Sequence, residues 1–335
     1  MATIRDIAKL ARVSVATVSR SLKMPDLVAP ATRDRVQAAV DRLGYKPNAL
    51  ARGFRRQRSE AIVVVVPYIH NPFYASVVQG IGNVAHANGY RVLLGESQDS
   101  QPRLDTYALM LDSKEADGLI LLGALLPSAI GRDPARSGRT RLPLVMACEY
   151  FPGLDAPTVR IDNAKAAAAA ADHLIQLGHR RIANIAGPLR NPLSRDRLKG
   201  FQAQMARAKI AVPRNYVAHG DFTAHSGYVA MKRLLELPSR PTAVTCANDE
   251  MAMGALKAIK ERRLSVPNDI SVIGFDNIRF SDFCDPPLTT IAQPQVEIGE
   301  TAMRLMLEVI AGRATATTVV LPYTLVLRAS TCKAR

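Results

Sequence analysis

Short apolar runs alternate with helical segments through most of the chain, from about residue 60 onward. The run AIVVVV occupies residues 61–66, and similar runs lie at residues 92–95, 118–122, 144–147, 182–186, 243–246 and 270–275. Segments with helical periodicity lie between them, for example at residues 73–87, 164–177 and 250–261. A continuous apolar run is typical of a strand that is buried on both faces. The alternation therefore predicts an α/β architecture in which helices cover both faces of parallel sheets.

The span from residue 60 to residue 335 is too long for one such sheet. We therefore predict two doubly wound parallel-sheet halves, with a crossover near Asp162 and Asn163 and a return near Gln293 and Pro294. On this division the first half holds residues 60–162 and 292–325, and the second half holds residues 163–291 and 326–332.

The first 46 residues have a different pattern, that of three short helices. Thr3, followed three positions later by Asp6, matches a capping box, and Ser14 can cap a second helix. A third helix is expected at residues 30–43, before Gly44, because glycine commonly ends helices. Two short helices joined by about three residues form a helix-turn-helix. We therefore predict an all-α helix-turn-helix headpiece at residues 1–46.

Positive charge is concentrated at this end of the chain. Residues 1–58 hold 13 Lys and Arg against 4 Asp and Glu, within a formal net charge of +15 for the whole chain. A compact basic segment favours a polyanionic partner, with nucleic acid first and an anionic membrane second, although an ordinary soluble surface can have the same composition. No apolar run approaches the roughly 18 residues that span a bilayer, and charged residues interrupt the N-terminus where a signal peptide would be apolar.

The four cysteines, Cys148, Cys246, Cys284 and Cys332, form no C-x-x-C pair. This pattern suits a reducing cytosol and argues against a disulfide framework or a zinc site. The six histidines show no metal-ligand spacing, and no serine or cysteine catalytic signature is present. We therefore expect a cytoplasmic protein without a metal, a cofactor or a membrane partner.

In a helix-turn-helix, the start of the second helix enters the major groove of DNA. Arg20 would reach furthest, and its planar fork can bond guanine O6 and N7. Val15 and Ala16 carry no polar side-chain atoms, so we expect them to contact thymine methyl groups from the face opposite to the inward-facing Val18 and Leu22. The other candidates for DNA contact, chiefly to phosphates that fix register, are Thr3, Ser14, Thr17, Ser19 and Arg33. The pattern alone also fits a three-helix bundle with an ordinary charged face.

The segments TIRDIAKLARVSVATVSRSL and VAPATRDRVQAAVDRLGYKPNALAR resemble the headpiece of the LacI/GalR repressors. Farther along, NPFYASVVQGI, LGHRRIANIAGP, NDEMAMGAL, ISVIGFDN and PPLTTIAQP resemble the periplasmic-binding-protein-like core of the same family, so the resemblance covers essentially the whole chain. It implies a homodimeric repressor that binds pseudo-palindromic operator DNA. It also implies that a small effector molecule changes the angle between the two halves of a core at residues 60–335.

The resemblance further implies a hinge helix within a linker at residues 47–59. The DNA contacts implied there are Asn48, Ala51, Arg52, Phe54 and Arg55. Phe54 occupies the position of the side chain that wedges into the minor groove, and phenylalanine is a known type of wedge. Gly53 lowers the helix propensity of this hinge by about 1 kcal/mol relative to alanine.

Ligands of open parallel sheets bind beyond the carboxyl ends of the strands, and with two halves the cleft lies between them. Aromatic side chains can stack on a flat ring there, while Arg, Asn and Asp bond hydroxyls or ring nitrogens. The resemblance implies effector contacts at Phe73, Tyr74, Arg197, Phe222, Asn248 and Asp276. For the polar residues the alternative is a helix cap or a bridge between halves, which suits Asp162 and Asp249 better. For Phe222 the alternative is core packing.

Within the family, FCDPPLTTIAQP and RGFRRQRSEAIVVVVPYIHNPFY are most similar to the branch that responds to nucleosides. This implies a nucleoside effector, with cytidine first and a purine base or a sugar as the alternative. An enzyme that acts on nucleosides or sugars, and a nonspecific architectural DNA-binding protein, are the hypotheses from other classes. Gly80, Gly82 and Ala85 match a dinucleotide-binding fingerprint, but they lie inside an expected helix. We therefore interpret them as a stripe of small residues for packing.

Overall fold

The computed structural model describes residues 2–45, 58–130 and 142–335. They fall into two compact units, Met1–Ser59 and Glu60–Arg335, which are treated separately below. The hinge residues expected to contact DNA (Asn48, Ala51, Arg52, Phe54 and Arg55) lie outside the described residues. In the described ranges, no helix is long and apolar enough to cross a membrane.

The headpiece consists of α1 (Ile4–Ala11), α2 (Val15–Lys23), a short 3-10 helix (Pro25–Leu27) and α3 (Pro30–Leu43). The expected caps are present. Thr3 and Asp6 form a reciprocal capping box, Ser14 Oγ accepts the Thr17 N–H, and Gly44 ends α3 with a φ of +57°. The headpiece core consists of Ile7, Ala8, Ala11, Val18, Val36 and Ala39. Leu43, at the end of α3, does not join this core, because the residue is 36% exposed.

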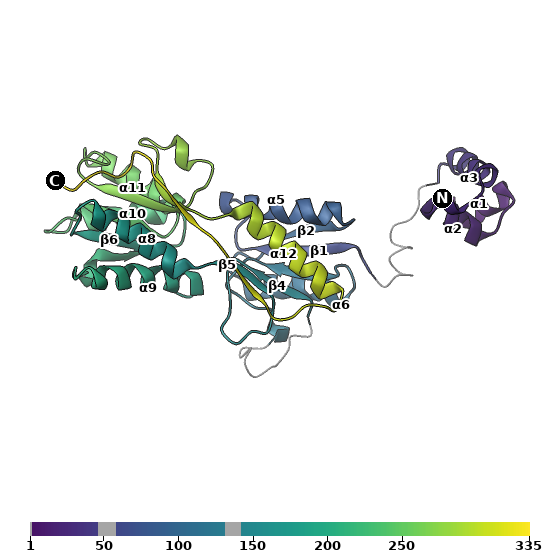
Figure 1. Ribbon diagram of the computed structural model, residues 1–335, viewed down its shortest axis with the longest axis horizontal. Coiled ribbons are helices and arrows are strands. Elements are labelled where there is room, and N and C mark those ends of the chain that lie inside the picture. Colours follow the sequence, from purple (N-terminus) through teal and green to yellow (C-terminus); the bar gives the residue numbers. More distant parts are fainter. Residues whose placement is uncertain (1, 46–57, 131–141) are drawn as a thin grey trace. The chain divides into compact units, whose positions relative to one another are not determined.

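The described residues of the core form two six-stranded sheets, so the α/β fold with two parallel-sheet halves is confirmed (Figure 1). The first sheet is parallel throughout, in the order β11 (Thr318–Leu321), β5 (Thr158–Ile161), β4 (Leu144–Ala147), β3 (Gly118–Leu121), β1 (Ala61–Val66) and β2 (Arg91–Glu96). The second has the order β12 (Thr324–Val326), β10 (Thr289–Ala292), β9 (Ser271–Asp276), β8 (Ala243–Cys246), β6 (Ile182–Ala186) and β7 (Val217–His219). Its strands are parallel except for β12, which runs antiparallel to β10.

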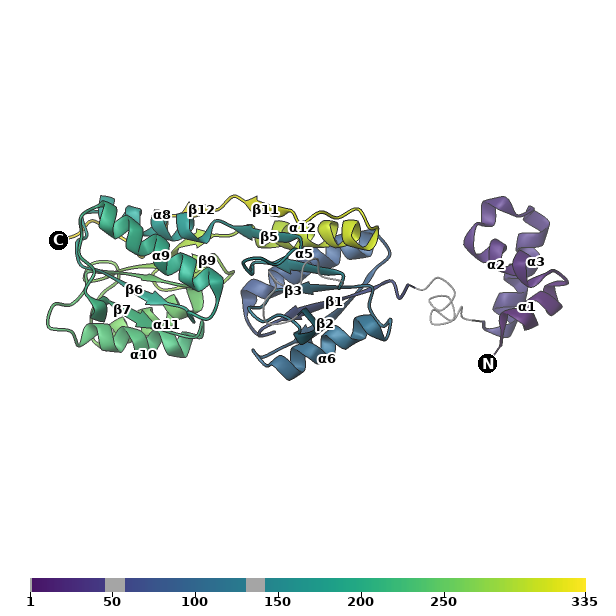
Figure 2. The same ribbon diagram turned by 90° about the horizontal axis from the view of Figure 1, so that it is seen from below.

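Helices cover both faces of each sheet, as Figure 2 shows. The first half has α5 (Pro72–Ala87), α6 (Gln101–Asp112) and α12 (Gln295–Ile310), and the second half has α8 (Asn163–Gln176), α9 (Pro192–Arg207), α10 (Ala224–Leu235) and α11 (Asp249–Glu261). The sequence did not indicate β5, β7, β10, β11 or β12. These strands are only three or four residues long, and most contain polar residues, so they lack the continuous apolar run of a central strand.

Within the described part of the core, the chain passes between the two halves three times. The first passage lies at Asp162, between β5 and α8, and the second lies between Ala292 at the end of β10 and Gln295 at the start of α12. The third was expected at residue 325. It lies between Leu321 and Thr324, because β12 pairs with β10 of the second sheet.

The two helices α5 and α12 pack backbone to backbone through glycines. A Cβ atom at Gly80 would lie 2.0 Å from the Val296 carbonyl oxygen, and a Cβ atom at Gly299 would lie 2.0 Å from the Val77 carbonyl oxygen. Gly80 lies inside α5, where no dinucleotide-binding turn exists, so the interpretation as a packing residue is confirmed for this glycine. A Cβ atom at Gly82 would meet no other atom within 4 Å, so Gly82 does not share this role.

Candidate DNA-binding face and effector cavity

The candidate DNA-binding face of the headpiece carries most of the expected residues at its surface. Ala16 and Arg20 are exposed on α2, while Ser19 and Arg33 are half-buried. Ser14 Oγ also lies 2.8 Å from Thr17 Oγ1, and the Thr3 hydroxyl donates to Asp6 Oδ2 at 2.8 Å. The polar atoms of these cap residues are therefore already engaged, although Ser14 and Thr3 remain exposed enough to approach a phosphate.

The placement of Val15 on the face opposite to Val18 is wrong. Val15 is half-buried and packs against the headpiece core together with Val13 and Leu22. The reason is helical spacing, since Val15, Val18 and Leu22 follow one another at intervals of three and four residues and so share one stripe.

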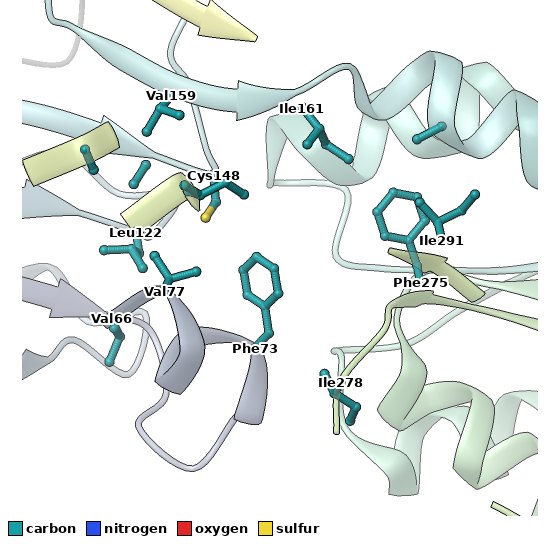
Figure 3. Close-up of a cluster of buried hydrophobic side chains, with 14 of the residues drawn as sticks. Val66, Phe73, Val77, Leu122, Cys148, Val159, Ile161, Phe275, Ile278 and Ile291 are labelled. Carbon is teal, nitrogen blue, oxygen red and sulfur yellow. The ribbon is translucent and has the colours of Figure 1, made fainter. Parts of the chain in front are cut away.

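In the core, all six residues implied as effector contacts line one cavity. The cavity is also lined by Asn71, Cys148, Leu193 and Gln293. Phe73 and Tyr74 come from the first turn of α5, Arg197 from α9, Asn248 from the cap of α11, and Asp276 from the end of β9. In Figure 3, Phe73 and Cys148 of the first half lie opposite Phe275 and Ile278 of the second half. These four residues belong to one buried apolar cluster that continues from one half into the other.

The cavity is small and closely filled. Its volume is about 30 Å³, which is room for about one water molecule. Pockets that bind small molecules typically measure roughly 300–1,000 Å³. A nucleoside-sized ligand therefore requires movement of the lining side chains or separation of the two halves.

Arg197 is the central polar group of the cavity and is 7% exposed. Its Nε donates to Asn163 Oδ1 at 2.8 Å, its Nη1 donates to the Ala247 carbonyl oxygen at 2.5 Å, and its Nη1 lies 3.7 Å from Asp276 Oδ1. Its guanidinium carbon also lies 3.7 Å from the centre of the Phe275 ring. Because Arg197 is held on several sides, it presents a fixed cation beside the Asp276 carboxylate.

Burial shifts the pKa values of Arg197 and of the two carboxyl groups near it. Burial raises the pKa of Asp276 to about 7, and the Arg197 guanidinium only partly opposes this rise. Burial also raises the pKa of Glu149 to about 7, against the hydrogen bond that the Leu193 N–H donates to Glu149 Oε2 at 3.3 Å. Burial lowers the pKa of Arg197, while Asp276 and Glu149 raise it. A nearly dry site of this kind strengthens any hydrogen bond to a ligand hydroxyl or amine.

Asn248 and Phe222 have structural contacts besides their place in the cavity. Asn248 Oδ1 accepts the Met251 N–H and so caps α11, while Asn248 Nδ2 donates to the Phe222 carbonyl oxygen at 2.9 Å. Phe222 has a φ of +73°, a left-handed conformation that this hydrogen bond helps to hold. The amide of Asn248 thus positions the Phe222 ring against the cavity.

Of the two aspartates interpreted as caps or bridges, Asp162 is a helix cap, but Asp249 is neither, because Asn248 caps α11 and the partners of Asp249 all lie in the second half. Asp162 Oδ1 accepts the Lys165 N–H at the start of α8. Asp249 is fully buried and accepts hydrogen bonds from the Ile278 N–H, the Ser281 hydroxyl and the Thr290 hydroxyl. Neither residue lines the cavity.

Sequence reasoning missed Glu149 and several residues that line the cavity, namely Asn71, Cys148, Leu193 and Gln293. Gln293 was noted only as part of a crossover. Glu149 lies two residues after the end of a recognisable buried strand, a position where site residues gather. Among the described residues, His, Cys, Asp and Glu side chains form no group of three that could hold a metal ion.

A helix-turn-helix headpiece joined to a two-half core with a polar cavity between the halves defines an effector-controlled DNA-binding regulator. Residues 3–48 match the family described as bacterial regulatory proteins, lacI family, and residues 171–331 match the periplasmic binding protein-like domain. The HTH-type transcriptional repressor CytR of Escherichia coli K12 is 46% identical over 93% of this chain and 91% of the relative. The chain therefore belongs to the lacI family and is an effector-controlled DNA-binding repressor, not an enzyme.

Two further comparisons agree with this assignment. The ribose operon repressor of Escherichia coli K12 is 37% identical over 92% of each chain. The crystal structure of the lac repressor dimer bound to operator and the anti-inducer ONPF is similar with a TM-score of 0.89 at 30% identity, and the match covers 99% of both chains.

Proposed function

We propose that this protein is a homodimeric cytoplasmic repressor of a pseudo-palindromic operator and that a nucleoside, with cytidine first, controls its affinity for DNA. The observation that carries the effector proposal is the gathering of Phe73, Tyr74 and Phe222 around the Arg197 and Asp276 pair in one cavity. Aromatic rings suit the flat base, and the ion pair suits the hydroxyls of the ribose. The resemblance to the nucleoside-responsive branch of the family supports the same ligand class.

On the DNA side, we propose that Arg20 reads a guanine and that Ala16 and the exposed part of Val15 contact thymine methyl groups. The phosphates on either side are held by Ser14, Thr17, Ser19, Arg33 and Thr3. The contact extends into the hinge through Asn48, Ala51, Arg52, Phe54 and Arg55. The exposure of Arg20 and Ala16 on α2 supports this division. Two headpieces read two half-sites, because the symmetry of a dimer is mirrored in its operator.

The size of the cavity supports a mechanism of control. A ligand that cannot enter about 30 Å³ binds better to a conformation in which the halves stand farther apart. It therefore shifts the population of the two conformations. Operator affinity follows this shift if the headpieces bind DNA in only one of them.

A sugar is the second candidate effector. The Arg197 and Asp276 pair suits a polyol without a base, and the 37% identical relative is named as the ribose operon repressor. The three aromatic rings distinguish the candidates, because a free sugar uses little of their flat surface.

Thermal unfolding of the full chain against a panel of nucleosides, bases and sugars tests the proposal. A ligand at about 100 times its dissociation constant adds about 2.7 kcal/mol to the native state. A rise in melting temperature with cytidine or another nucleoside supports the proposal. A rise only with sugars or purine bases replaces the effector, and no rise with any nucleoside contradicts the proposed ligand class.

A further inference from the structure

Asp276, which faces Arg197 in the effector cavity, has a backbone conformation that favours glycine. Its φ is +108°, and the φ of the next residue, Asn277, is +55°. A residue with a side chain is strained at such angles and keeps them only where the surrounding structure enforces them. The contacts that enforce this conformation therefore control where the carboxylate lies.

Two glutamines on one crossover segment supply contacts of this kind. Gln293 Nε2 donates to Asp276 Oδ1 at 2.7 Å, and Gln295 Nε2 donates to the Asp276 carbonyl oxygen at 2.6 Å. One glutamine thus fixes the side chain of Asp276 and the other fixes its backbone. The segment leaves β10 in the second sheet and becomes α12, so a residue of the second half is tied to the first turn of a helix that belongs to the first half.

A series of contacts leads from α12 through α5 back to the cavity. The helices α12 and α5 meet backbone to backbone at Gly80 and Gly299, so they cannot slide independently without a clash. The first turn of α5 carries Phe73 and Tyr74, which line the cavity opposite Asp276. The two sides of the effector cavity are therefore connected through Gln295 and α12 as well as through the cavity itself.

We propose that Gln295 is a positioning residue that couples the occupancy of the effector cavity to the angle between the two halves. The inference rests on the proposed function, because it takes Asp276 as an effector contact. Gln293 lines the cavity, but Gln295 does not, so Gln295 acts through Asp276. A ligand that takes over the Asp276 carboxylate displaces the strained β9 terminus, and Gln295 passes this displacement to α12.

The test is the ratio of operator affinities without and with saturating cytidine, measured on a duplex that the wild-type protein selects from random DNA. The variant is Gln295→Met, which keeps the length of the side chain and removes the amide. The control is Gln204→Met, because Gln204 Nε2 donates to Asp172 Oδ1 at 2.6 Å within the second half, away from the crossover. Saturation removes any effect of weaker cytidine binding, so a merely structural change does not move the ratio.

We expect the ratio of operator affinities without and with cytidine to be about tenfold or more for both the wild type and Gln204→Met. This value lies within the usual range of allosteric coupling. For Gln295→Met we expect a ratio below about threefold, with unchanged operator affinity in the absence of cytidine. A wild-type ratio retained by folded Gln295→Met overturns the inference alone. If Gln295→Met does not fold, Gln295→Ala replaces it under the same criterion. A wild-type ratio of one with cytidine overturns the proposed effector, and this inference with it.

Discussion

At the scale of single residues, the headpiece and the cavity use charge in different ways. Arg20 is an exposed cation on α2. Arg197 is a buried cation whose bonds to Asn163, Ala247 and Asp276 fix it in advance. We interpret the first as a reader of an external polyanion and the second as part of a preorganised ligand site.

Replacing Arg20 tests the reading of bases. We expect Arg20→Ala to lower affinity for the selected operator by about 1–3 kcal/mol, since it removes a bidentate contact to guanine. Affinity for unrelated DNA should fall much less, because phosphate contacts supply most of that binding. The measurement is fluorescence anisotropy on both duplexes at one salt concentration. Equal losses on the two duplexes would show that Arg20 holds a phosphate instead.

Glu149 makes the stability of the core depend on pH. Its pKa rises from 4.5 to about 7 on burial, so the folded state binds more protons than the unfolded state between these values. The free energy of unfolding should therefore fall as pH rises through this window. Asp276 contributes with the same sign, because burial raises its pKa from 3.8 to about 7. Arg197 and Arg195 face Glu149 and oppose the effect only in part.

The variant Glu149→Gln keeps an acceptor for the Leu193 N–H and does not titrate. We expect urea unfolding between pH 5 and pH 8 to show a shallower decline in stability for this variant than for the wild type. Parallel curves for the two proteins would mean that Glu149 is ionised in the folded state throughout this range.

At the scale of elements, the sequence predicted what depends on local pattern. Caps at Thr3, Ser14 and Gly44 and the buried central strands follow from short-range rules, and the structure contains all of them. The edge strands β7, β11 and β12 form because a neighbouring strand offers free backbone groups, and no local pattern shows this. The inward position of Val15 was not predicted, because the two faces of α2 were assigned from the chemistry of its side chains and not from helical spacing.

The site was predictable to a similar extent. The six residues proposed as effector contacts follow from the family motifs, and they line one cavity in the structure. Glu149 and Gln295 form hydrogen bonds with residues farther along or back in the chain, Leu193 and Asp276 respectively. Such contacts depend on how the halves meet, which single-sequence patterns do not contain.

The packing of α5 on α12 gives a prediction with an internal control. We expect Gly80→Ala to destabilise the core by about 1–3 kcal/mol or more, because its methyl group would overlap the Val296 backbone. Gly82→Ala lies two residues away in the same helix with nothing within 4 Å of the added methyl group. It should stabilise the core by up to about 1 kcal/mol, since alanine favours helices. Similar melting temperatures for the two variants would contradict the close packing.

At the scale of the whole molecule, three crossovers connect two halves around a cavity of about 30 Å³. An effector that requires more room cannot bind unless the lining side chains move or the two halves separate. The structure of the core is therefore suited to couple the binding of a ligand to a change in conformation. The headpiece, with its own core of Ile7, Val18 and Val36, can fold as a separate unit that reads DNA.

The most direct test of the account is a titration of the selected operator with the full-length protein at fixed salt, without and with cytidine. We predict that saturating cytidine changes operator affinity by about tenfold or more and leaves affinity for unrelated DNA unchanged. Ribose at the same concentration should have no effect. Unchanged operator affinity with cytidine and with every other nucleoside would contradict control of this repressor by a nucleoside.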